Sequence, residues 1–169
     1  FYTQYFIDAM SPSNFVTLNP DVLKEAMETN GQSLVDGLQN LMTDLEKGRI
    51  TMTDESAFVL GENIGVSEGS VVFRNHLFEL IQYSPSTETV DQRPLLIVPP
   101  CINKFYILDL QPQNSYVKWC VDQGNTVFLI SWANTTPAYS HIGWDDYVQD
   151  GIFEATRVVK EITGEKKIN

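Results

Sequence analysis

The sequence predicts an α/β protein with an incomplete, mostly parallel sheet, preceded by a small helical segment. Two apolar runs, Leu95–Val98 and Thr126–Ser131, have the composition of strands buried on both faces. A helical pattern that includes Tyr116 and Val121 separates the two runs. Strand, helix and strand thus follow one another within residues 95–131, which is typical of a βαβ unit with a parallel strand pair.

Residues 1–69 are expected to form a helical segment and a linker. After a first apolar helix, Asn19 and Pro20 mark a helix start, because Asn accepts hydrogen bonds at an N-cap and Pro suits the first helical position. A further stripe covers Ser33–Glu46 and ends before Gly48, a residue type that commonly terminates helices. Its apolar members are Leu34, Val35, Leu38, Leu41, Met42 and Leu45. The remaining residues up to 69 have no sustained period and indicate surface loops.

Residues 70–169 predict the first half of a larger α/β domain. Val71–Phe73 and Leu77–Tyr83 are strand candidates that precede the apolar run at residue 95. A long helix starts near Trp144 and ends at Gly164, and Lys167–Asn169 begins a third parallel strand. Because a doubly wound sheet would be left with an unpaired edge there, we expect further residues to complete it.

The composition narrows the class of protein. A chain of 169 residues with 43% hydrophobic residues is typical of one globular domain, and its net charge of −11 disfavours nucleic acid and anionic membrane surfaces as partners. No apolar run reaches the roughly 18 residues of a membrane span.

The start at Phe1 has neither Met nor a basic signal-peptide region, so we expect a piece of a longer protein. Two cysteines form no disulfide framework, which favours a reduced cytoplasmic setting.

No complete catalytic constellation stands out in these residues. Cys101 follows a buried strand and is a candidate nucleophile, but nothing in the sequence places a histidine beside it; the alternative is a small apolar side chain. Cys120 lies on the apolar stripe of a helix and is expected in the core. Neither His76 nor His141 has a second His or Cys at ligand spacing, so we expect no metal site. The chain contains no glycine-rich phosphate loop and no Gly-x-Ser-x-Gly elbow.

The loop that begins at Cys101 lies where open α/β sheets bind ligands, at the carboxyl end of a buried strand. In α/β-hydrolase folds, the loop after the third strand supplies one oxyanion-hole donor, and the residue after the nucleophile supplies the other. The backbone N–H groups of Cys101 and Ile102 are candidates for this role, since Pro99 and Pro100 have no N–H to offer.

Several stretches are similar to one enzyme family. They are Met10–Phe15, Asn19–Pro20, Thr53–Phe58, Leu95–Pro112, Gln123–Phe128, Ser131–Trp132 and Trp144–Tyr147. Taken in order over essentially the whole chain, they resemble the N-terminal conserved region of bacterial polyhydroxyalkanoate (poly-3-hydroxybutyrate) synthases of the class I type.

This resemblance implies an acyltransferase with an α/β-hydrolase fold, of which the chain would be the N-terminal part. Such an enzyme polymerises (R)-3-hydroxyacyl groups from coenzyme A thioesters into polyhydroxyalkanoate, releases coenzyme A and needs no cofactor. The family's nucleophile is a Cys in a Gly-x-Cys-x-Gly box, supported by a His and an Asp. All three are expected downstream of Asn169, the box within about ten residues, so that this chain alone is inactive and contains no catalytic residue.

Within the shared motif, the resemblance makes the loop at Cys101 and Ile102 a wall of the catalytic pocket. The candidates that would line or brace this pocket are Asn103, Lys104, Tyr106 and Asp109. The chain departs from the family at Ser131–Thr135, where relatives commonly have an Arg and this sequence has Ala133. Because an anchor for a carboxylate or phosphate is missing there, we expect the cations that bind coenzyme A to lie elsewhere.

A rival interpretation treats the helices of residues 20–46 as a non-catalytic interaction module. Their apolar stripes would join two copies into a homodimer or bind granule-associated proteins; the structural alternative is that they pack on the α/β core. The resemblance implies a cytoplasmic enzyme at polyhydroxyalkanoate granules, with the hydroxyacyl-CoA substrate and the polyester product as its other partners.

Overall fold

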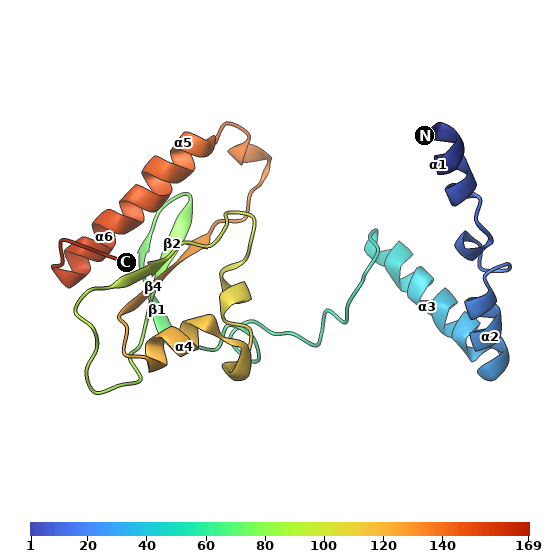
Figure 1. Cartoon of the computed structure of the whole chain (residues 1–169), viewed down its shortest axis with the longest axis horizontal. Helices are drawn as coiled ribbons and strands as arrows, with labels where there is room; N and C mark the ends of the chain where they lie inside the picture. The colour runs from blue at the N-terminus through green and yellow to red at the C-terminus, as the bar shows by residue number, and fades with distance from the viewer. The chain divides into compact units, whose positions relative to one another are not determined.

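The computed structural model describes all 169 residues, which form two compact units, Phe1–Glu55 and Ser56–Asn169 (Figure 1). The predicted division at residue 69 lies C-terminal to this boundary. Residues 56–68 belong with the second unit because they bond to it: the Gly65 N–H donates to the Asp109 carbonyl at 2.8 Å, and Ser67 Oγ donates to the Asp109 carboxylate at 2.6 Å.

The N-terminal unit consists of short helices. They are α1 (Tyr2–Ala9), a 3-10 turn (Pro12–Asn14), α2 (Pro20–Glu28) and α3 (Gln32–Lys47). The Asn19 side chain accepts a hydrogen bond from the Asp21 N–H at 2.9 Å, and Gly48 ends α3 in the left-handed region at φ 67°. The predicted helix start and stop are therefore confirmed.

The second unit is built on a four-stranded sheet in the order β1-β2-β4-β3. The strands are β1 (Gly69–Arg74), β2 (Phe78–Tyr83), β3 (Leu95–Ile97) and β4 (Val127–Trp132). The β3–β4 pair is parallel, as the βαβ pattern predicts, whereas β1 pairs with β2 and β2 pairs with β4 in antiparallel fashion. The expectation of a mostly parallel sheet is therefore wrong for these residues, and the sheet is mixed.

A tight turn explains the antiparallel half of the sheet. Only Asn75, His76 and Leu77 separate β1 from β2, so the chain reverses direction without room for a crossover. The Asn75 side chain fixes this turn by accepting hydrogen bonds from the N–H groups of Leu77 and Phe78 at 2.8 and 3.0 Å. Sequence reasoning recognised the two strands but not the hairpin that joins them.

Helices cover both faces of the sheet (Figure 1). The helical segments are 3-10 turns at Phe105–Leu108, Pro112–Asn114 and Pro137–Tyr139, α4 (Tyr116–Asp122), α5 (Trp144–Asp146), a π-helix, η5 (Tyr147–Phe153), and α6 (Glu154–Thr163). Alternate residues of β4 face the two layers: Phe128 and Ile130 pack in the cluster that includes α6, and Val127 and Leu129 in the cluster that includes α4. The predicted long helix is thus continuous but changes to π-helical geometry near its start.

The outer side of β3 is occupied by the last residue of the chain. The Asn169 N–H donates to the Pro94 carbonyl at 2.9 Å, and the Leu96 N–H donates to the Asn169 carbonyl at 3.0 Å. This pair of bonds is the pattern of a parallel ladder, which the expected third parallel strand requires. The three residues of β3 are half-buried, so the expectation of a strand buried on both faces is wrong for β3 in these residues.

Candidate functional site

The candidate site begins at the turn that follows β3. Pro99 and Pro100 end the strand, and the Asn103 N–H donates to the Pro100 carbonyl at 2.9 Å, which closes a four-residue turn. Cys101 and Ile102 are the two central residues of this turn. Their backbone N–H groups donate no hydrogen bond within the chain, so both are available to an oxygen atom of another group.

An apolar cavity of about 390 Å³ lies beside Cys101. It is lined by Val98, Pro99, Pro100, Cys101, Trp132, Trp144, Tyr147, Val148 and Ile152. The Cys101 side chain is half-buried, whereas the Ile102 side chain is exposed. The turn therefore lies between the apolar cavity and the solvent.

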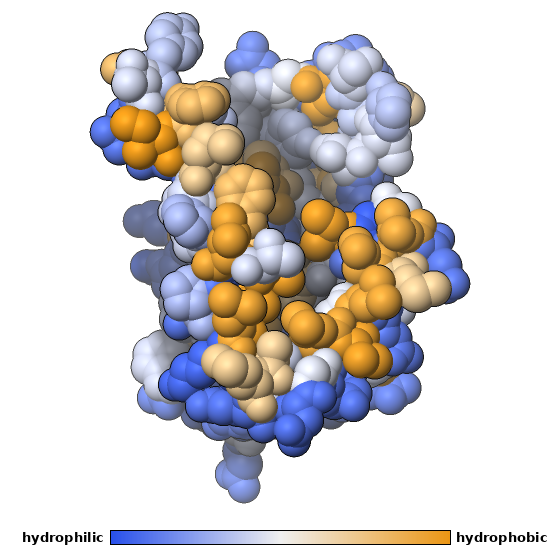
Figure 2. All heavy atoms as spheres, turned by 90° about the vertical axis from the view of Figure 1, so that its right-hand side faces the viewer, coloured by the Kyte–Doolittle hydropathy of each residue, from blue (hydrophilic) through white to orange (hydrophobic).

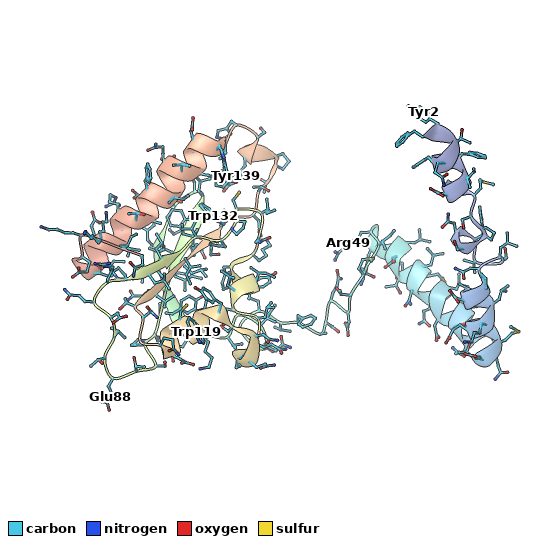
Figure 3. The ribbon with its side chains drawn as sticks, in the orientation of Figure 1. Tyr2, Arg49, Glu88, Trp119, Trp132 and Tyr139 are labelled. Atoms are coloured by element: carbon cyan, nitrogen blue, oxygen red, sulfur yellow. The ribbon has the colours of Figure 1, made fainter.

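A second, larger cavity of about 690 Å³ lies at the same end of the sheet and contains two of the predicted pocket residues, Lys104 and Tyr106. Residues from β1, β2 and β4 and from the loops after them form the remaining wall, among them Arg74, His76 and Asn134. Lys104 Nζ donates to Asn134 Oδ1 across this cavity. Trp132 and Tyr139, which also line it, lie near one another at this end of the sheet in Figure 3.

The other two predicted pocket residues, Asn103 and Asp109, do not line this larger cavity. Asn103 is exposed on the turn. Asp109 is 1% exposed, and its carboxylate accepts hydrogen bonds from the Ser67 N–H at 3.1 Å and from the hydroxyls of Ser67 and Ser115, each at 2.6 Å. Asp109 therefore ties the segment before β1 to the start of α4 and lines neither of the two cavities described above.

The remaining titratable candidates do not form a catalytic group. Cys120 is buried in the core, as predicted, and burial raises the pKa of its thiol despite a hydrogen bond with Tyr116. His76 Nε2 lies 4.0 Å from the Asp150 carboxylate on the surface, and His141 is exposed. No three His, Cys, Asp or Glu side chains gather closely enough to hold a metal ion.

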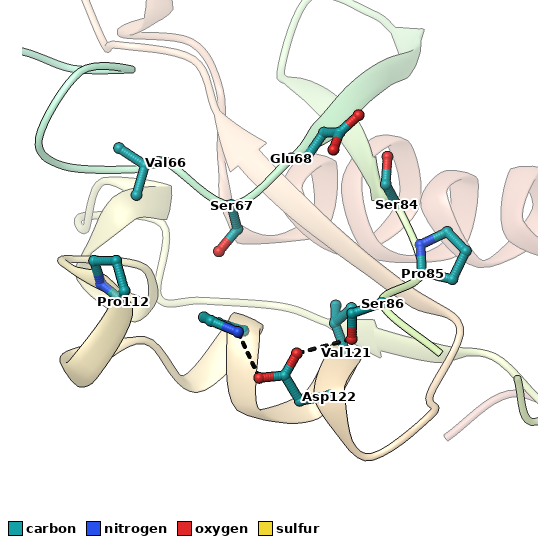
Figure 4. Close-up of a pocket in the computed structure, with 10 residues that line it drawn as sticks. Val66, Ser67, Glu68, Ser84, Pro85, Ser86, Pro112, Val121 and Asp122 are labelled. Carbon is teal, nitrogen blue, oxygen red and sulfur yellow. Dashed lines mark hydrogen bonds and ion pairs between the residues drawn. The ribbon is translucent and has the colours of Figure 1, made fainter. Parts of the chain in front are cut away.

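A further cavity, of about 340 Å³, lies at the other end of the strands, near the start of β4, and Figure 4 shows the residues that line it. It is lined by residues before β1, after β2 and on α4, and Asp122 accepts hydrogen bonds there from Lys118 at 2.6 Å and Ser86 at 2.8 Å. These two bonds lower the pKa of the Asp122 carboxyl. This cavity contains none of the predicted site residues, so we place the candidate site at the carboxyl ends of β3 and β4.

Sequence reasoning missed most of the residues that surround the turn. Trp132 stands at the carboxyl end of β4, next to β3, so the rule that parallel strands place their ligands at this edge could have marked it. Arg74 and His76 come from the β1–β2 hairpin. Since the hairpin was not predicted, no sequence signal linked these two residues to the turn at Cys101.

The N-terminal unit has an exposed apolar surface, and its hollows contain none of the predicted site residues. None of the residues of α1, α2 or α3 is buried. On α3, the side chains of Leu38 and Leu45 are 59% and 72% exposed. Figure 2 shows apolar side chains gathered on one face of these helices. No helix of the chain combines the length and the apolar character that crossing a membrane requires.

Comparison with known proteins gives a consistent result. A family model described as poly-beta-hydroxybutyrate polymerase (PhaC) N-terminus matches residues 1–120. The chain is 50% identical over its full length to the poly(3-hydroxyalkanoate) polymerase subunit PhaC of Cupriavidus necator and 44% identical to that of Rhizobium meliloti. It is 48% identical, over 99% of its length, to the poly(3-hydroxyalkanoate) polymerase of Methylorubrum extorquens.

The matched region is one part of each relative. The chain spans 29%, 28% and 28% of the lengths of these three proteins, respectively. The family match nevertheless covers more than half of the chain, and the identities extend through both units. The chain therefore belongs to the family of poly-beta-hydroxybutyrate polymerase (PhaC) N-terminal regions.

Proposed function

We propose that the chain is the N-terminal part of an acyltransferase that polymerises (R)-3-hydroxyacyl groups from coenzyme A thioesters into polyhydroxyalkanoate. In each addition, a hydroxyl oxygen replaces the thioester sulfur at the acyl carbon, an oxoester forms, and coenzyme A leaves as the thiol. The observation that carries this proposal is the 50% identity, along the whole chain, to a poly(3-hydroxyalkanoate) polymerase. We propose no cofactor, since the coenzyme A thioester is itself the substrate.

The second unit is proposed to be the first half of an α/β-hydrolase domain. Two features support this: the sheet order β1-β2-β4-β3 with an antiparallel β2, which is the order of the first four strands in that fold, and helices on both faces. The two hydrogen bonds of Asn169 also support it, because their pattern is the one that a further parallel strand beside β3 would make. A strand of about five residues from this point would lead to the nucleophile elbow.

The strand register gives the turn at Cys101 its proposed role. Asn169 bonds on both sides of Leu95, so the two residues lie opposite one another. Counting along both strands, Cys101 is level with a position about six residues beyond Asn169. A Gly-x-Cys-x-Gly elbow there would place its nucleophile next to the free amides of Cys101 and Ile102. These amides are then the oxyanion-hole donors that this chain contributes, with the catalytic Cys, His and Asp supplied by the rest of the enzyme.

The pocket residues have separate proposed roles. Lys104 and Tyr106 form one wall of the larger cavity, and Asn103 lies on the exposed side of the turn. Asp109 lies a few residues after the turn, and its hydrogen bonds to Ser67 and Ser115 hold this part of the chain in place. We propose that this edge of the sheet receives the acyl-thioester end of the substrate.

The test uses the full-length enzyme with (R)-3-hydroxybutyryl-CoA, and the measured quantities are free thiol release and polymer mass. The wild-type enzyme is expected to release coenzyme A and to form polymer in proportional amounts. Cys101→Ala is expected to keep measurable polymerisation, because the backbone N–H survives the substitution. Absence of both products in the wild type would contradict the proposed function; complete loss in a folded Cys101→Ala variant would mean that the nucleophile has been misplaced.

We also propose that the N-terminal helices bind a protein partner, either a second copy of the enzyme or a granule-associated protein, and so keep a cytoplasmic enzyme at polyhydroxyalkanoate granules. The supporting observation is the exposed stripe of α3. Its members Leu34, Val35, Leu38, Leu41, Met42 and Leu45 are 47–72% exposed.

Deleting residues 1–47 from the full-length enzyme tests this second proposal. The deletion is expected to shift the oligomer distribution in analytical ultracentrifugation or to reduce the fraction of enzyme that sediments with polymer granules. If both quantities match the undeleted enzyme, the helices have no role in association, and the stripe then packs against the enzyme itself.

A further inference from the structure

The segment that carries the turn is fixed to the fold by very few bonds. Residues 98–103 make two hydrogen bonds: the turn's own bond from Asn103 to Pro100, and one from the Trp132 indole Nε1–H to the Pro99 carbonyl at 2.7 Å. Since prolines cannot donate, Pro99 can be tied only through its carbonyl. Trp132 is therefore the residue that connects this segment, through a buried hydrogen bond, to the rest of the sheet.

The indole of Trp132 is held in place from several sides. It is 9% exposed, and its ring meets Phe78 and Tyr147 edge to face, with centroid distances of 6.1 and 5.4 Å. Gly151 packs directly against the far edge of the ring, where a Cβ atom would lie 2.8 Å from two of its carbons. A side chain at residue 151 would therefore have to move the indole.

The helix that supplies Gly151 has an unusual shape at this point. Gly151 lies in the π-helical stretch η5, a geometry that is rare and occurs frequently at functional sites. The neighbouring Asp150 carbonyl accepts a hydrogen bond from the Asn75 side chain at 2.8 Å, which fixes the wide turn to the β1–β2 hairpin. Gly151 and Tyr147 of this stretch, together with Phe78 of β2, thus form a slot that the indole fills.

We propose that Trp132 is a positioning residue for acyl transfer, and that the π-helical slot at Gly151 sets the position of its indole. By holding the Pro99 carbonyl, Trp132 keeps the adjacent amides of Cys101 and Ile102 directed at the oxygen of the reacting acyl group. The inference rests on the proposed polymerase function. Oxyanion donors act only within a few tenths of an ångström of the right distance, and a displacement of about 1 Å can lower the rate by about 100-fold.

The first test is Trp132→Phe in the full-length enzyme, which keeps an aromatic ring but removes the donor to Pro99. The rate is measured with (R)-3-hydroxybutyryl-CoA and divided by the number of active sites, counted from the burst of coenzyme A in the first turnover. We expect kcat per active site to fall about tenfold or more while KM changes less than about twofold. Trp119→Phe is the matched control, because Trp119 is 57% exposed and lies on α4.

The second test keeps the donor and moves the ring. Gly151→Ala is expected to lower kcat per active site several-fold, whereas Gly37→Ala, at a helix position with nothing within 4 Å, should leave it unchanged. In the double variant, the smaller phenyl ring leaves room for the new methyl group. Gly151→Ala should therefore cost little when Trp132→Phe is already present, a non-additive result that general destabilisation would not give.

The outcomes separate this inference from the function on which it rests. A wild-type enzyme that releases no coenzyme A overturns the proposed function and this inference with it. An active wild type with a folded Trp132→Phe variant of unchanged kcat overturns the inference alone, as does a rise in KM without a fall in kcat. If Trp132→Phe does not fold, Gly151→Ala decides: kcat per active site equal to that of Gly37→Ala contradicts the inference.

Discussion

The two units of this chain use similar amphipathic helices in opposite ways. On α6, Ala155, Val158 and Val159 are buried against the sheet. On α3, a stripe of comparable regularity has no buried member. An apolar face shows where a helix can bury surface, but it does not say against which surface, and that second fact decides how much the helix contributes to stability.

The largest expected effect is in the core of the second unit. Phe128→Ala removes a fully buried ring from the middle of β4 and should lower the free energy of unfolding by about 3–5 kcal/mol. All three tryptophans lie at residues 119–144, so urea unfolding followed by tryptophan fluorescence reports on this unit alone.

Leu38→Ala is the matching change in the N-terminal unit. Because Leu38 is 59% exposed, we expect a change within about 0.5 kcal/mol in helix unfolding followed by far-UV circular dichroism. A cost above about 2 kcal/mol in the full-length enzyme would show that the α3 stripe is covered there, and the contrast between the units would disappear.

An intermediate effect is expected at Asp109. Asp109→Ala leaves the Ser67 N–H and the hydroxyls of Ser67 and Ser115 without their acceptor, at a cost of about 1–3 kcal/mol. The same fluorescence-detected unfolding measures it. Exposed Asp145→Ala is the control; equal stability of the two variants would refute the bracing role of Asp109.

The smallest effect on the free energy of unfolding is expected from removing a buried polar group. This substitution should stabilise the protein, whereas the preceding ones destabilise it. The Tyr83 hydroxyl is buried and has no hydrogen-bond partner, so Tyr83→Phe should stabilise the second unit by up to about 1 kcal/mol. Burial, and then the charge of Asp109, raise the pKa of this phenol above its ordinary value.

This shift also predicts a pH dependence. The phenol of Tyr83 has a higher pKa in the folded protein than in the unfolded chain, where the pKa is about 10. Above that pH the unfolded chain therefore ionises first, and the free energy of unfolding falls as the pH rises; below it, this group costs no stability. Tyr83→Phe should therefore flatten the loss of stability above pH of about 10. A steeper loss in the variant would contradict this.

The sequence predicted local features of the fold well. Asn19, Gly48 and Gly164 mark helix ends because capping depends on a few adjacent residues. The buried strand β4 and the parallel β3–β4 pair also followed from apolar runs. The antiparallel hairpin did not, because its turn at Asn75 lacks the glycine that usually signals one.

The site was predictable only in part. The free amides at Cys101 and Ile102 follow from two prolines and a strand end, which are local facts. The contact between Trp132 and Gly151 joins β4 to a π-helical turn, and no periodicity in the sequence indicates a π-helix. The bracing role of Asp109 was not predictable either, because its partners Ser67 and Ser115 lie on other segments.

The central claim is that this chain supplies backbone donors to a nucleophile that it does not contain. The most direct test is to incubate the full-length enzyme with labelled (R)-3-hydroxybutyryl-CoA, quench the reaction, and locate the acyl group by peptide mass mapping. We expect the label on a cysteine within about ten residues after Asn169, in a Gly-x-Cys-x-Gly sequence. Label on Cys101 or Cys120 would contradict the account.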